Sequence, residues 1–133
     1  MRKQGWEVIL QQYIDTQRDM PFAWGVNDCV LFSANAANAI LEEDLQPQID
    51  SYGDYDEDMG KALILECNGI AGIFDRHFKR KPIKTANRGD IVLVKYEGNK
   101  VAGICNGRNV ICKTHTGIKF IPIDLALAAW SVD

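Results

Sequence analysis

Apolar residues recur at helical spacing along the first part of the chain. In residues 3–17 they fall on one face with polar residues between them, which predicts an amphipathic helix packed on a larger body. Pro21 follows, and proline disfavours helix in the residue before it. A second helix is predicted over about residues 28–43. Its middle, residues 33–39, contains only small side chains. Since small residues let a helix approach its neighbours closely, we expect this helix to be the buried axis of the domain.

Two shorter helices are predicted next. Residues 56–68 begin with acidic residues and place apolar side chains on one face. Asn68-Gly69 closes this helix, as glycine commonly does at helix ends. Residues 70–78 form a further short helix in this interpretation.

An acidic, turn-rich segment over residues 42–58 separates the second helix from the third. We expect it to be a solvated surface loop, and whether it covers a cleft is left open. The alternating aspartates of residues 54–58 resemble the start of a calcium loop. Met59 and Leu65 stand where that loop needs glycine and glutamate, so no metal site is predicted.

The second half of the chain changes to short β-rich runs separated by Gly- and Asn-containing turns. Helices followed by an antiparallel meander indicate a single α+β domain over residues 1–133. The predicted strands are residues 91–96, 101–105, 110–113 and 118–123, followed by a helical turn over 124–129 and an edge strand over 129–132.

Composition narrows the class of protein. The chain has 133 residues and 47% hydrophobic content, enough for one domain with a real core. A net charge of −3 gives no general attraction for nucleic acid, and the basic residues 76–84 are interpreted as a solvated face. No apolar run approaches the length of a membrane span, and the N-terminus lacks an apolar signal region. We therefore expect synthesis in the cytosol and no membrane span.

Four cysteines without a signal region indicate free thiols rather than a disulfide framework. No Cys-x-x-Cys pair is present, so neither a metal nor another cofactor is predicted. Cys105 and Cys112 could face each other across a hairpin, and we interpret them as ordinary strand residues.

The candidate chemistry lies at the start of the second helix. Asn27 or Asp28 can cap this helix, and Cys29 follows in its first turn. The helix dipole favours a thiolate there, which is the nucleophilic form of cysteine. Phe22 and Trp24 can form the wall of a groove beside the sulfur. The alternative is a small buried cysteine in a helix that packs on a sheet.

Three short motifs occur in the order seen in the NlpC-type branch of papain-like cysteine peptidases. They are Trp24-Gly-x-x-Asp28-Cys29, Gly89-Asp90-Ile91-Val92 and Val101-Ala-Gly103-Ile104-x-x-Gly107. Over residues 3–132 the chain more closely resembles the small NlpC-like proteins of tailed phages and prophages, which share an ending like Ala129-Trp130-Ser131-Val132. The resemblance implies a papain-like fold, in which the cysteine-bearing central helix packs on a C-terminal antiparallel sheet.

The same resemblance implies catalytic roles for particular residues, and at one of these positions the sequence differs from the NlpC pattern. It makes Cys29 the nucleophile and places the histidine base and its orienting partner at the positions of Val101 and Cys112. Valine cannot accept a proton, so the expected base is missing. His115, near the turn after the third strand, could replace it. His77 is a weaker candidate, because it lies within the basic segment.

Two functions follow from the resemblance. A domain without its base would be a structural or adaptor part of a phage tail, with other tail proteins as partners and the virion as its location. An active domain would be a cysteine peptidase or amidase that cleaves peptidoglycan stem peptides during host entry. Cys29 would then attack, His115 would be the base, and main-chain N–H groups would stabilise the oxyanion. A third hypothesis is a binding module that uses the Phe22 and Trp24 groove. The missing base favours the non-catalytic role.

Overall fold

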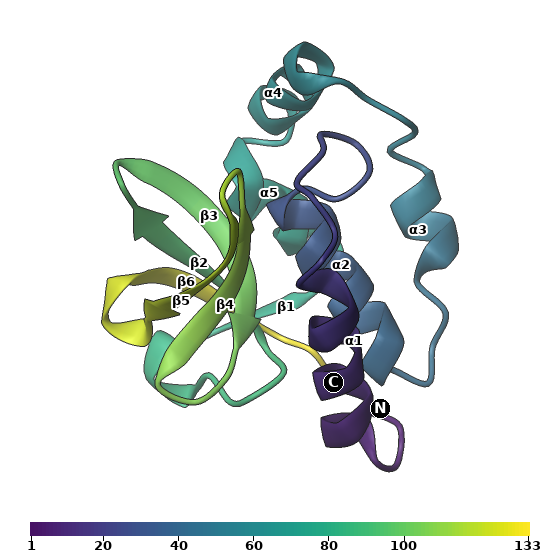
Figure 1. The fold of residues 1–133 in the computed structure, drawn as a ribbon, viewed down its shortest axis with the longest axis vertical. Helices are drawn as coiled ribbons and strands as arrows, with labels where there is room; N and C mark the ends of the chain where they lie inside the picture. Colours follow the sequence, from purple (N-terminus) through teal and green to yellow (C-terminus); the bar gives the residue numbers. More distant parts are fainter.

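Helices and sheet form two neighbouring layers in the computed structural model, which describes all of residues 1–133 (Figure 1). The helical layer comes mainly from the first half of the chain and the sheet from the second, as the sequence predicts. The helices are α1 (Trp6–Gln17), α2 (Cys29–Ile40), α3 (Gln46–Asp50), α4 (Glu57–Glu66) and α5 (Gly69–Asp75), with short 3-10 helices η1 (Ile83–Thr85) and η2 (Ile123–Leu125). The strands are β1 (Lys79–Lys81), β2 (Ile91–Tyr96), β3 (Asn99–Cys105), β4 (Asn109–Thr114), β5 (Gly117–Pro122) and β6 (Ala126–Ser131).

The six strands form one antiparallel sheet in the order β1-β6-β2-β3-β4-β5. The meander from β2 to β5 is confirmed, and the tight turn at Glu97-Gly98 has positive φ at both residues, as such hairpin turns require. The predicted C-terminal strand is present as β6, but it begins at Ala126, within the predicted helical turn, and its predicted edge position is wrong. β6 lies inside the sheet, because the unpredicted strand β1 pairs with its outer side. β1 reads Lys-Arg-Lys, a pattern that gives no strand signal.

The helix α2 is the buried axis of the molecule, as its small residues predict. Phe32, Ala36 and Ala37 are fully buried, and the helix packs between α1 and the strands β3 and β4. Tyr13 of α1 donates a hydrogen bond from its hydroxyl to the main-chain oxygen of Phe32. The first residue of α2, Cys29, is thereby held on an element that cannot shift easily.

Both faces of the sheet are buried. Ile91, Leu93 and Ile104 pack against the helices in one apolar cluster, while the alternate side chains form a second cluster on the other face. Cys105 and Cys112 belong to this second cluster, opposite Val110 and Gly103 rather than opposite each other. The suggestion that the two cysteines face one another across the hairpin is therefore wrong. All four cysteines are free.

The aspartate of the Gly-Asp-Ile-Val motif ties the ends of the chain to the sheet. Asp90 accepts hydrogen bonds from Arg2 Nη2 at 3.1 Å, Lys81 Nζ at 2.7 Å, and the main-chain N–H groups of Asn87 and Val132. We call these five residues the Asp90 cluster. Both termini consequently lie close together at one end of the molecule (Figure 1).

The segments expected to be solvated have defined structure. The acidic residues 42–58 contain α3, and the basic residues 76–84 contain β1 and the ion pair between Arg80 and Asp75. None of the helices combines the length and the apolar character that a membrane crossing requires.

Candidate functional site

The loop before α2 is organised by one carboxylate. Asp28 is the N-cap of the helix, and its Oδ1 accepts a hydrogen bond of 2.9 Å from the main-chain N–H of Leu31. Its Oδ2 accepts another, of 3.1 Å, from the N–H of Gly25. Asp28, rather than the neighbouring Asn27, is therefore the cap that the sequence predicts at one of these two positions. Cys29 follows it as the first helical residue.

A tyrosine from the acidic segment completes the environment of this carboxylate. The hydroxyl of Tyr55 donates to Asp28 Oδ2 at 2.5 Å. The main chain of Tyr55 packs directly on Gly25, whose φ is +74°, and a Cβ at that glycine would collide with it. No local pattern predicts this contact, because a tyrosine among aspartates is typical of a solvated segment. Residues 55–60 are thus docked on the loop that precedes Cys29.

The tryptophan of the first motif is fixed by the same segment. Trp24 Nε1 donates to Glu57 Oε1 at 3.1 Å, and Gly60 leaves room for the indole, since a Cβ there would lie 2.9 Å from the ring. Phe22 meets Trp24 edge to face, with ring centroids 5.6 Å apart. Phe22 and Trp24 both line the cavity that contains Cys29, as predicted.

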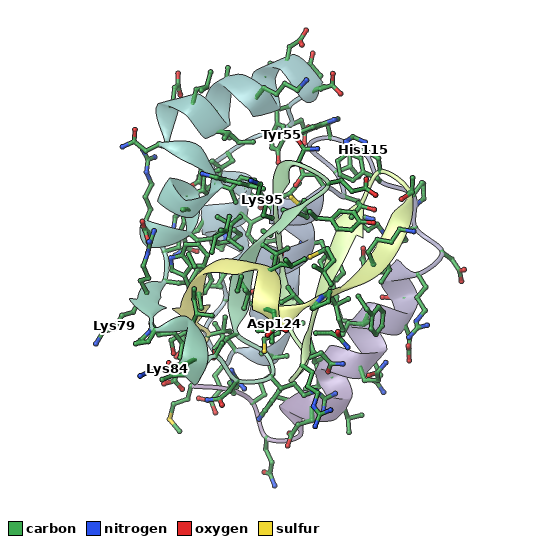
Figure 2. The ribbon with its side chains drawn as sticks, turned by 90° about the vertical axis from the view of Figure 1, so that its left-hand side faces the viewer. Tyr55, Lys79, Lys84, Lys95, His115 and Asp124 are labelled. Carbon is green, nitrogen blue, oxygen red and sulfur yellow. The ribbon has the colours of Figure 1, made fainter.

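His115 lies at the mouth of this cavity and stacks on an aromatic side chain. Its ring centroid is 4.1 Å from that of Phe22 and 6.1 Å from that of Trp24. Figure 2 shows His115 and Tyr55 at the same end of the molecule. His115 is exposed and forms no hydrogen bond with Cys29. The structure therefore brings the two predicted catalytic residues to one cavity without joining them.

The thiol of Cys29 is held in its protonated form. Burial raises the pKa of Cys29 to about 11, and the negative charge of Asp28 acts in the same direction. The main-chain N–H groups of Ala102, Cys29 and Val30 oppose this shift in pKa but do not outweigh it. The predicted thiolate is therefore not favoured, because desolvation exceeds the effect of the helix start.

The two positions that the NlpC resemblance gives to the base and its partner are apolar or buried. Val101 is half-buried on β3 and lines the same cavity as Cys29. Cys112 is fully buried in the second apolar cluster, and burial raises its pKa further above the ordinary range of a thiol. Neither residue can take a proton from Cys29 at neutral pH.

The other histidine is engaged elsewhere on the cavity wall. His77 Nε2 lies 2.6 Å from the hydroxyl of Tyr52, and burial together with the charge of Arg76 lowers the pKa of His77. Both side chains line the cavity on the side of α3 and α5. His77 thus belongs to a local pair with Tyr52 rather than to the surroundings of Cys29.

One buried cation near the site was not predicted. Lys113 is fully buried on β4, and its Nζ donates to the main-chain oxygen of Gln17 at 2.5 Å and lies 3.5 Å from Gln17 Oε1. No carboxylate pairs with it, and burial lowers its pKa. It binds a carbonyl at the C-terminal end of α1, where a cation is favoured. The sequence could not show this, because Lys113 follows the apolar residues 110–112 near the end of β4, where a lysine usually reaches solvent.

The cavity itself has a volume of about 480 Å³ and a predominantly apolar wall. The acidic segment supplies part of this wall through residues of α3, Tyr52 and Tyr55, so it is not simply a solvated loop. No three His, Cys, Asp or Glu side chains lie together in an arrangement that could hold a metal ion. The geometry is that of a binding cavity with an unassisted thiol on its wall.

The comparisons with known proteins place the chain in a family. No curated protein matches the sequence. One family model covers nearly all of the chain, residues 1–132. The chain belongs to the family described as Domain of unknown function (DUF6950).

Proposed function

We propose that this protein is a papain-like, NlpC-type domain without a working catalytic dyad, which serves as a structural or adaptor component of a phage or prophage tail. One observation carries the non-catalytic part. The cysteine at the nucleophile position has a pKa raised to about 11 and no hydrogen-bonded base. Cysteine hydrolysis needs a thiolate and a group that protonates the leaving amine, and this cleft supplies neither.

The retained residues support a structural role for the first motif. Trp24, Gly25 and Asp28 are each engaged by Glu57, Tyr55 or the start of α2. These contacts fix the loop and the helix start whether or not Cys29 reacts. The motif would therefore be retained in a scaffold that does not hydrolyse anything. The location in a tail comes from the resemblance to small NlpC-like phage proteins, with other tail proteins as partners.

Complementation of a phage or prophage that lacks this protein tests the proposal. Cys29→Ala and His115→Ala should each restore assembled, infective particles to the level given by the unaltered protein, and the purified protein should release no stem-peptide products from peptidoglycan. Gly25→Arg, which cannot fit against Tyr55, serves as the folding-defective control. Loss of infectivity with Cys29→Ala in folded protein would overturn the proposal. So would the absence of the protein from purified tails.

The active hydrolase is the second candidate, and one observation favours it. His115 and Cys29 line the same cavity, and His115 is exposed and held only by aromatic contacts with Phe22 and Trp24. A substrate that displaced Phe22 could bring the imidazole to the sulfur. Release of stem-peptide products that stops with either Cys29→Ala or His115→Ala would establish this function.

A further inference from the structure

The cavity beside Cys29 extends between four helices. Its wall includes Leu31 of α2, Ile49 of α3, Leu63 and Ile64 of α4, and Phe74 of α5. A volume of about 480 Å³ lies within the roughly 300–1,000 Å³ of ligand-binding cavities. Leu31, Ile49, Leu63 and Ile64 are only half-buried, so the cavity leaves apolar surface that an occupant would cover.

Several polar side chains on the wall are already paired within the protein. Tyr55 bonds to Asp28, and Tyr52 bonds to His77. Lys113, at the opposite side, bonds to the main chain of α1. A polar ligand body would find these groups occupied and would lose its hydrogen bonds with water. The interior therefore suits a ligand with an apolar body.

The main chain of the inner wall offers no partners to a polar ligand. This wall is formed by α2, α3, α4 and α5, and helices use their N–H and C=O groups internally. At the rim, β3 pairs with β2 along most of its length but with β4 only from Gly103 to Cys105, so Val101 lies on a stretch with one unpaired edge. An extended peptide that paired with this edge is the competing occupant, because its amides need main-chain partners. A hydrocarbon chain between the helices has no such requirement.

Two uncompensated cations stand next to each other at one rim. Lys100 of β3 lines the cavity, and Lys95 lies directly opposite it on β2. Both lysines are exposed and neither forms a salt bridge; Glu97, in the connecting turn, also lines the cavity, so the two lysines outnumber the one carboxylate at this rim. Like charges opposite one another are unfavourable, and a bound anion relieves that repulsion. The rim therefore complements a negatively charged head group.

We propose that this cavity binds one free long-chain fatty acid, with its hydrocarbon chain between α2, α3, α4 and α5 and its carboxylate at the rim beside Lys100. This goes beyond the adaptor role and does not depend on the chemistry of Cys29. Association is driven by the apolar chain, and the carboxylate sets orientation. Each pair of methylene groups removed from the chain should weaken binding about tenfold.

Fluorescence titration of the full chain with cis-parinaric acid, followed by displacement with unlabelled ligands, tests the inference. Hexadecanoic acid should displace the probe at a ratio of one per chain and dodecanoic acid much more weakly. Hexadecanol reports on the contribution of the carboxylate. A lysophospholipid and an acetylated apolar pentapeptide distinguish a free fatty acid from other sources of an apolar group, and both should compete poorly.

Matched variants locate the site. Ile49→Trp fills the cavity and should weaken binding of the acid more than tenfold, whereas Val8→Trp on the exposed face of α1 should leave it unchanged. Lys100→Met should weaken the acid about threefold and leave the alcohol unchanged, which is the size expected for an exposed charge pair. Lys84→Met is the charge control, because Lys84 lies on η1 away from Lys95 (Figure 2).

Three results would overturn the inference. The first is that no fatty acid of any chain length displaces the probe from protein that melts cooperatively. The second is equal binding of the acid by Ile49→Trp and Val8→Trp, and the third is competition by the pentapeptide or the lysophospholipid as strong as that of hexadecanoic acid. Covalent turnover of an acyl thioester by Cys29 would contradict the non-catalytic proposal while leaving the cavity assignment intact, so the two failures are distinguishable.

Discussion

Two buried aspartates, each from one of the short motifs, are satisfied in different ways. Asp90 is 1% exposed and is bound by two cations, Arg2 and Lys81, together with main-chain N–H groups. Asp28 is 2% exposed and is bound only by neutral donors, namely two main-chain N–H groups and the Tyr55 hydroxyl. The ion-paired site joins the termini and β1 to the sheet, and the neutral site shapes the loop beside Cys29.

The two carboxylates therefore differ in what they control: Asp90 acts on the stability of the fold, and Asp28 acts on the protonation of Cys29. The charge of Asp90 is compensated by Arg2 and Lys81 within its own cluster, so Asp90 acts on the rest of the molecule by holding segments of the chain together. The charge of Asp28 is not compensated by any cation in contact, and it raises the pKa of the adjacent Cys29. A carboxylate without a cation beside a thiol opposes formation of a thiolate. We therefore expect the Asp90 cluster to dominate folding and the Asp28 contacts to dominate the properties of the cleft.

The largest effect is expected for Asp90→Ala. Removing this carboxylate leaves Arg2 and Lys81 partly buried without an anion, which should lower the free energy of unfolding by about 3–5 kcal/mol. Urea denaturation followed by circular dichroism measures the change. Asp124→Ala, on an exposed acid, is the control and should change stability by less than about 0.5 kcal/mol. A loss below about 1 kcal/mol for Asp90→Ala would show that the ion pairs do not hold the termini.

Gly25→Ala tests how tightly residues 55–60 are docked on the loop that precedes Cys29. The residue has a φ of +74° and no room for a Cβ against the main chain of Tyr55, so we expect a loss of about 3 kcal/mol. Gly53→Ala isolates the conformational part, because Gly53 has a φ of +71° and nothing within 4 Å of an added Cβ. It should lose only about 1 kcal/mol. Equal losses for the two variants in thermal unfolding would refute the docking.

Asp28→Ala should lower stability by about 2 kcal/mol, less than Asp90→Ala, because the groups that it leaves unpaired are neutral. Asp56→Ala is its match, since Asp56 caps α4 through Met59 at an exposed position and should lose about 1 kcal/mol. Removal of the Asp28 charge should also lower the pKa of Cys29. If chemical denaturation showed Asp28→Ala to be as damaging as Asp90→Ala, the distinction between the two carboxylates would fail.

Tyr55→Phe gives the smallest expected change, a loss of about 1 kcal/mol from one partly buried hydrogen bond to Asp28. Tyr52→Phe removes an exposed bond to His77 and should cost less than about 0.5 kcal/mol. Hydrogen exchange of residues 52–60 provides the local readout. Exchange there should become faster in Tyr55→Phe, and unchanged exchange would mean that the hydroxyl does not hold the segment.

Much of the fold could be predicted from periodicity. The spacing of apolar residues locates α1, α2 and α4 to within a few residues, and the small residues of α2 identify it as the buried axis. The β-rich runs and their Gly-containing turns locate the meander from β2 to β5. These are local sequence patterns, and the predicted helices and strands are present because the tertiary packing favours the same local structure.

The remainder depends on contacts between distant segments. β1 is a run of basic residues that becomes a strand only because β6 passes beside it. Tyr55 and Lys113 find their partners 27 and 96 residues away, so no local pattern announces either contact. The protonation of Cys29 is of the same kind. Its helix position favours a thiolate, but burial by the surrounding elements decides the outcome.

The rate of Cys29 alkylation against pH, read by mass spectrometry on folded protein beside a His115→Ala variant, shows whether the cleft holds a working thiolate. A protonated thiol without a base should be alkylated slowly, with a rate that rises toward an inflection near pH 11 and is the same in both proteins. An inflection well below about 8.5, the ordinary pKa of a cysteine, would contradict this expectation if His115→Ala also moved that inflection upward. That result would show a working thiolate–imidazolium pair.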